Sequence, residues 1–88
     1  MKLTVAQEFE LEYLESYANE ILNKVSQNVI KYRKENNLTQ IQLANAIGYK
    51  SAAYLGKAEL RKENHHFNIK QVAKISQVLN IDIAKFFQ

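Results

Sequence analysis

Few residues in this 88-residue chain have the types and spacing needed for catalysis or metal binding. His65 and His66 are the only histidines, and because they are adjacent they cannot place two ligands on one face of a helix. Cysteine is absent, which excludes a disulfide scaffold, a thiolate zinc site and a cysteine nucleophile. No His-and-acid pattern lies near the serines, which are Ser16, Ser26, Ser51 and Ser76. We therefore expect no enzyme activity, no metal and no cofactor, and a polar loop at the two histidines.

The charges of the chain are unevenly distributed. Residues 1–23 carry one lysine and five glutamates, whereas residues 24–88 carry eleven lysines and arginines and four acids. A change of sign along the chain suggests that one part binds a polyanion and another part serves something else. Lysines and glutamates that merely solvate helix faces would give the same totals. The sequence motifs are therefore needed to distinguish the two interpretations.

Length and composition restrict the class of protein. A chain of this length allows one small domain. Two glycines and no proline leave few turn signals for a many-stranded sheet. No apolar run approaches the roughly 18 residues that span a bilayer, and the N-terminus lacks a basic-then-apolar signal pattern. We expect an all-α protein in the cytoplasm with no membrane partner.

Capping boxes indicate where the helices begin. In this motif a short polar residue precedes the helix, and a Gln or Glu three positions later reaches back to its amide. Two pairs form complete boxes, namely Thr39 with Gln42 and Asn68 with Gln71. Asp82 offers a weaker cap, while Gly48 and Asn80 suit the left-handed residue that ends a helix. The sequence therefore predicts helices over about 40–47, 51–60, 69–79 and 83–87.

Two apolar stripes follow the first 36 residues at helical spacing. The first stripe contains Leu11, Leu14, Ala18, Leu22, Val25, Val29 and Tyr32. The second contains Val5, Phe9, Tyr13, Tyr17 and Ile21. One stripe can cover the domain's own core. The other stripe is either ordinary core or a surface that binds a second chain. We favour a surface that binds a second chain, because so small a domain cannot bury both stripes. Thr4 with Gln7 could open this helix and Ser26 could start a separate one, so one long helix and two shorter ones both remain open.

The segment from Leu38 to Glu59 carries the functional pattern. A short helix ends at Gly48, a tight turn follows, and a second helix starts at Ser51, with Ala44 small enough for the two to approach closely. Two short helices joined in this way form a helix-turn-helix. The pattern consists of Leu38-Thr39-Gln40-Ile41-Gln42-Leu43-Ala44, Gly48-Tyr49-Lys50-Ser51 and Glu59. It resembles the phage repressor/Cro-type (XRE-type) helix-turn-helix family, in the variant whose turn is one residue longer. The tail from Phe67 to Phe87 is similar to the fourth and fifth helices of that family.

The resemblance implies a lambda-repressor-like five-helix domain that binds double-stranded DNA, and it implies a role for each matching residue. Thr39 and Gln40 would contact a phosphate at a helix N-terminus. The groove-facing side of the recognition helix would present Ser51, Ala52 and Tyr54, with Lys50 beside them. Contacts with the DNA backbone are plausible for Lys57, Arg61 and Lys62. Arg33 and Glu59 match an internal ion pair that orients the motif without reading bases.

Several positions depart from the family pattern. Gly56 and Ala58 stand where a small polar and a branched apolar residue are usual, and Arg61 stands where glycine is usual. Ala52 and Ala53 replace long polar side chains that commonly read bases. Alanine can only meet a thymine methyl group or allow close approach, so phosphate contacts and DNA shape are expected to carry more of the binding.

These observations lead to one function and one alternative. We expect a transcription regulator, a repressor in the first instance, that acts as a homodimer on two half-sites about 34 Å apart. Residues 1–24 are assigned to an amphipathic dimerisation helix, in which Phe9, Tyr13, Tyr17 and Ile21 face the second chain, and residues 25–88 to the DNA-binding domain. The alternative is an antitoxin-like interaction module that uses the N-terminal helix to bind a different protein and binds DNA weakly or not at all.

Overall fold

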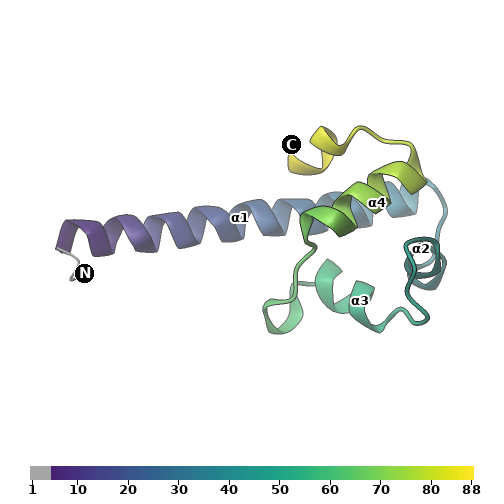
Figure 1. Cartoon of the computed structure of the whole chain (residues 1–88), viewed down its shortest axis with the longest axis horizontal. Helices are drawn as coiled ribbons and strands as arrows, with labels where there is room; N and C mark the ends of the chain where they lie inside the picture. The colour runs from purple at the N-terminus through teal and green to yellow at the C-terminus, as the bar shows by residue number, and fades with distance from the viewer. Residues whose placement is uncertain (1–4) are drawn as a thin grey trace.

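The computed structural model describes residues 5–88, and it describes the side chains from residue 10 onward. The helices are α1 (Val5–Glu35), α2 (Gln40–Ala46), α3 (Ala53–Glu59), the 3-10 helix η1 (Lys62–Asn64), α4 (Ile69–Leu79) and the 3-10 helix η2 (Ile83–Phe87) (Figure 1). Over this described range no strand is present, which confirms the all-α class. The expected Thr4–Gln7 box and the side chain of Phe9 lie outside the described part. None of the helices within residues 5–88 combines the length and the apolarity needed to cross a membrane.

Helix α1 is continuous through Ser26, so residues 5–35 form one long helix rather than two. The Ser26 hydroxyl does not cap a helix; it is buried and donates to the carbonyl of Ala58 at 2.8 Å. Ser26 therefore packs the C-terminal half of α1 against the end of α3.

Only the C-terminal half of α1 belongs to the compact part of the molecule. The other helices gather around this half, and the N-terminal half projects alone from one end (Figure 1). The side chains of residues 10–20 are exposed, whereas Val25 and Val29 are buried. Ile21 and Leu22 are half-buried, and the helix runs without a break across the boundary expected between residues 24 and 25.

The hydrophobic core joins α1 to α2, α3, α4 and η2. It contains Val25, Val29, Leu43, Ala44, Ile47, Leu55, Ala58, Phe67, Val72, Ile75, Leu79 and Phe86. Phe86 of η2 is fully buried and meets the edge of the Tyr32 ring at a centroid distance of 5.3 Å. The Asn28 amide donates to the carbonyls of Phe86 and Gln88, at 2.8 and 3.0 Å, and so ties the C-terminus to α1.

Both expected capping boxes are present. Thr39 accepts from the amide of Gln42 at 3.2 Å, and Asn68 accepts from the amide of Gln71 at 2.8 Å. Consequently α2 and α4 begin where the sequence predicts. Helix α3 begins at Ala53, two residues later than expected, because the residue before it is Ala52, which has no polar side chain to cap the helix.

Candidate nucleic-acid interface

Helices α2 and α3 pack closely because the residues between them are small. Ala44 and Ala58 are completely buried, as is Leu43. The chain leaves α2 through Gly48, whose φ of 102° lies in the left-handed region that favours glycine. The Tyr49 amide then donates to the carbonyl of Ala44 at 2.8 Å. These contacts hold α3 at a fixed position beside α2, as a helix-turn-helix requires.

A buried ion pair fixes the end of α3 against α1. The Arg33 guanidinium donates from Nε to Glu59 Oε2 at 2.7 Å and from Nη2 to Glu59 Oε1 at 3.1 Å. Its Nη1 donates to the carbonyl of Leu38 at 2.9 Å, and the Gln40 amide donates to Glu59 Oε1 at 2.9 Å. Arg33 is 8% exposed and Glu59 is 5% exposed. One carboxylate therefore joins α1, the entry to α2 and the end of α3.

The outward face of α3 and of the turn before it is built mainly from small side chains. Its exposed members are Lys50, Ser51, Ala53, Lys57 and Leu60, and its half-buried members are Ala52 and Gly56. The Lys57 ammonium lies 3.9 Å from the carboxylate of Glu63, and both groups are solvent-exposed. Such a surface pair contributes little, so Lys57 remains available to an external anion. With Glu59 buried against Arg33, α3 exposes a cation and no carboxylate of its own.

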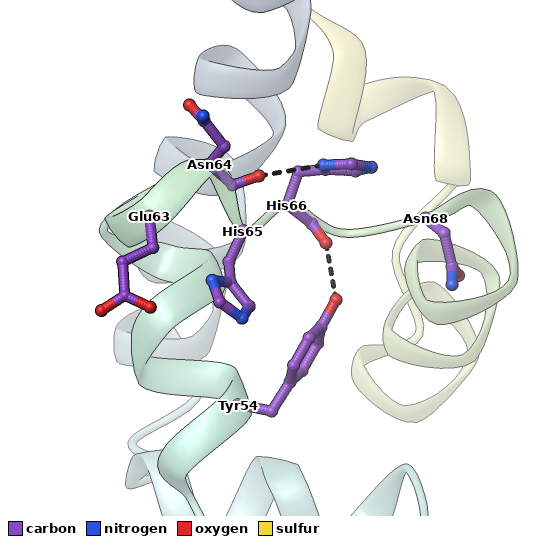
Figure 2. A pocket seen from close by; sticks show the side chains of 6 residues that line it. All are labelled: Tyr54, Glu63, Asn64, His65, His66 and Asn68. Atoms are coloured by element: carbon purple, nitrogen blue, oxygen red, sulfur yellow. Dashed lines mark hydrogen bonds between the residues drawn. The ribbon is translucent and has the colours of Figure 1, made fainter.

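Tyr54 points toward the chain rather than outward. Its hydroxyl lies 2.6 Å from the carbonyl of His66 and 3.2 Å from Oε1 of Gln71, and its ring stacks on Tyr49 at a centroid distance of 5.5 Å. Figure 2 shows the hydroxyl beneath the loop that carries the two histidines. Tyr54 was expected on the groove-facing side; in the structure it anchors the loop between α3 and α4.

Arg61 directs its guanidinium toward α1, where two of its three nitrogens are hydrogen-bonded and the third, Nη1, is buried without a hydrogen-bond partner among the described residues. It donates from Nε to the Asn23 side chain at 3.1 Å and from Nη2 to the Asn19 side chain at 3.2 Å. Its φ of 55° turns the chain at the end of α3, where the family usually has glycine. The structure thus directs Arg61 toward α1 and away from the outward face of α3, whereas Lys62 is exposed.

The two histidines belong to the loop structure. The His65 ring nitrogen Nδ1 lies 2.8 Å from the carbonyl of Lys62, and the His66 Nδ1 lies 3.4 Å from the carbonyl of Asn64. Figure 2 shows the His65 ring on the side of Tyr54, with the His66 ring on the other side of the backbone. Throughout the part of the chain that the structure describes, no group of three potential metal-binding side chains is found.

Several of these contacts have no signal in the sequence. Asn19 and Asn23 are ordinary polar positions of an exposed helix until the fold brings Arg61 to them. Leu60 is 73% exposed at the end of α3. Gly56 faces Gln40 of α2, whose side-chain atoms would lie 3.6–3.9 Å from a Cβ built at this glycine. Only the packing of α2 on α3 reveals these neighbours.

Comparison with known proteins agrees with this geometry. The sequence pattern of a protein family described as helix-turn-helix matches residues 29–86. The matched range starts inside α1, at buried Val29, and ends at buried Phe86 of η2. No match was found among curated proteins or among solved structures.

Proposed function

Because the chain belongs to the XRE-type helix-turn-helix family of DNA-binding regulators, we propose that α3 enters the major groove of double-stranded DNA. In this proposal the protein regulates transcription, as a repressor in the first instance. The observation that carries the proposal is the outward face of α3, which exposes Lys57 while its single carboxylate, Glu59, is neutralised by Arg33. A duplex presents a dense row of phosphates, so the burial of Glu59 against Arg33 removes a charge that would oppose binding. The exposed carboxylate of Glu63 belongs to η1, and it lies 3.9 Å from the Lys57 ammonium.

Phosphate contacts supply most of the affinity in this proposal. Lys50, Lys57 and Lys62 are exposed around α3 and would contact the DNA backbone. Thr39 and Gln40 stand at the start of α2, where backbone amides point toward an approaching phosphate. Tyr54, through its hydroxyl, and Arg61, through Nε and Nη2, position the loop and the end of α3.

Base recognition is sparse. Ser51 can exchange hydrogen bonds with a base edge, and Ala52 and Ala53 can contact thymine methyl groups. The small side chains let the backbone of α3 come close to the groove. Sequence preference then arises largely from the shape and deformability of the duplex.

Replacing Gly56 by alanine is expected to raise the free energy of unfolding by about 0.5–1 kcal/mol, since the residue is inside a helix. The added Cβ meets only the Gln40 side chain at 3.6 Å, an ordinary van der Waals contact. Gly48→Ala is the matched control, because its φ of 102° makes the same substitution destabilising. Urea denaturation followed by circular dichroism measures both, and a loss of stability in Gly56→Ala would contradict the packing of α2 on α3.

A homodimer completes the proposal, since two half-sites one helical turn apart match a two-fold symmetric protein. The exposed N-terminal half of α1 is the proposed dimer element. The same exposed helix, with Leu11 at 48% and Tyr13 at 67%, favours a second candidate, an antitoxin-like module that binds a different protein. A dimeric sample in light scattering supports the homodimer, whereas a monomer that dimerises only with another protein supports the module.

A fluorescence anisotropy titration tests the DNA-binding function. The labelled probes are a random duplex and the DNA upstream of the chain's own coding sequence, each at two salt concentrations. We expect tighter binding to the upstream DNA, with an affinity for both probes that falls as salt rises. The absence of binding to either duplex at low salt would rule the proposal out.

A further inference from the structure

The molecule exposes more surface than a compact monomer of its size. Its accessible surface is 6226 Å², whereas a compact monomer of 10.2 kDa is expected to expose about 5,300 Å². Its radius of gyration is 15.4 Å, against about 12 Å for a compact chain of this length. The excess of about 900 Å² is close to the roughly 800 Å² that each partner contributes to a standard protein interface.

The part of the chain that projects from the compact domain is the N-terminal half of α1 (Figure 1). Leu11, Leu14 and Ala18 continue the stripe of α1 whose later members, Val25 and Val29, are buried in the domain's core. Leu11 is 48% exposed and Leu14 is 56% exposed. The side of the helix that faces the core therefore extends beyond the domain with nothing from the described part of the chain to cover it.

An apolar groove stands where α1 leaves the domain. It has a volume of about 290 Å³ and is lined largely by Ile21, Leu22, Phe67, Ile69 and Phe87. Ile69 is 67% exposed on its rim. The groove begins one turn beyond Ala18 on the same side of α1, so stripe and groove form one continuous apolar surface.

We propose that a second copy of this chain covers this surface, with the two α1 helices packed antiparallel. The proposal rests on the homodimer proposed above and specifies its interface. In this packing Leu14 of one chain lies against Ala18 of the other chain. Leu11 of one chain lies against Ile21 of the other chain, beside the groove. The two-fold axis then passes near residue 16 of both helices.

Charge favours the antiparallel arrangement over the parallel one. Residues 10–20 contain four glutamates and no cation. Parallel helices would place Glu10 of each chain near Glu15 of the other and would leave the groove empty. Antiparallel helices bring Glu10 of one chain near Lys24 of the other, twice by symmetry, and both side chains are exposed in the single chain. Antiparallel packing thus covers the groove and forms two Glu10–Lys24 pairs, against a single approach of the two Glu15 side chains beside the two-fold axis.

The same geometry gives a spacing for the recognition helices. Ser26 marks the point where α3 contacts α1. This point is ten residues from the two-fold axis, so the two contact points are about 30 Å apart along the paired helices. Two half-sites on adjacent turns of one face of a duplex require about 34 Å. The points at which α3 meets α1 in the dimer are therefore separated by nearly one turn of DNA.

Disulfide trapping of single-cysteine variants tests the orientation, because the natural chain has no cysteine to interfere. Leu14→Cys and Ala18→Cys chains, which carry tags of different size, are oxidised separately and as an equimolar mixture. Antiparallel packing predicts cross-linked heterodimers in the mixture, at least tenfold above the homodimers that either variant forms alone. Ser16→Cys, on the opposite side of α1, is the control and is expected to cross-link with neither.

Every result of this experiment decides the proposal. Cross-linked homodimers from each variant alone would show parallel packing and would overturn the proposal. A dimer that is seen in light scattering but forms no cross-links would place the interface elsewhere and would also overturn the proposal. A monomer at all concentrations would also overturn it and would favour a different protein as the partner. The DNA titration of the natural chain is independent, so cross-linking without DNA binding would contradict only the DNA-binding function.

A second pair of variants measures the interface without a cross-link. Leu14→Glu is expected to raise the dissociation constant of the dimer by about 100-fold or more, since the axis places two copies of this side chain in the interface. Ser16→Glu is the matched control: Ser16 is exposed on the opposite side of α1 from the stripe, so the dimer is expected to persist. Equal losses in the two variants would contradict the assigned face. Both residues lie outside the core, so thermal unfolding of the domain remains measurable in either variant.

Discussion

Replacing Arg33 by alanine is expected to lower the free energy of unfolding by about 3–5 kcal/mol. The substitution removes three hydrogen bonds, two to the Glu59 carboxylate and one to the carbonyl of Leu38. The larger effect is that the carboxylate, in a residue only 5% exposed, is left in the core without its cation. A domain of this size has about 5–15 kcal/mol in total, so the variant loses much of its stability.

Urea denaturation at neutral pH, followed by circular dichroism, measures this loss. Lys34→Ala is the matched control, because Lys34 is the exposed neighbour of Arg33 on the same helix and is expected to change stability by less than about 0.5 kcal/mol. A double variant, Arg33→Met with Glu59→Leu, removes both charges and is expected to recover most of the loss. Equal stability of Arg33→Ala and the natural chain would contradict a buried pair.

The parts of the fold that depend on local sequence could be predicted well. Helices α2 and α4 begin where their capping boxes place them, and Asn80 ends α4 with a φ of 54°. In each case the signal lies within four residues of the boundary that it sets. The start of α3 was predicted two residues early, because neither Ser51 nor Ala52 supplies a side-chain cap and the turn geometry alone decides the boundary.

The loop after α3 could not be predicted from local signals. Three of its residues, Arg61, Glu63 and Asn64, adopt positive φ values of 55°, 55° and 63°. Glycine is the residue that usually marks such a conformation, and this loop contains none. The contacts of Arg61 with α1 and of Tyr54 with the His66 carbonyl compensate the strained backbone, and they join residues far apart in the sequence.

The candidate site was accessible to sequence reasoning only in part. The positions of Lys50, Ser51 and Lys57 follow from the helix-turn-helix spacing, and the structure leaves all three exposed. The directions of Tyr54 and Arg61 depend on which element packs beside them, and no spacing rule contains that information. The pairing of Arg33 with Glu59 was expected from the family resemblance and not from the residues themselves, since 26 positions separate them.

Replacing Lys50 or Lys57 by alanine is expected to weaken DNA binding and to flatten its dependence on salt. Each lost phosphate contact should reduce the slope of log K against log salt by about 0.9, and the double variant should reduce it by about 1.8. Both side chains are exposed, and Lys57 has only the weak Glu63 pair to lose, so stability should change little.

Anisotropy titrations at four or more salt concentrations give these slopes. Lys85→Ala is the matched control, because it removes the same charge from exposed η2, which lies on the other side of α1 from α3 (Figure 1). Its slope should equal that of the natural chain. If Lys85→Ala flattened the slope and the two α3-side variants did not, the duplex would lie against η2. In that case the buried ion pair of Glu59 with Arg33 would stabilise the packing of α3 and would have no role in DNA binding.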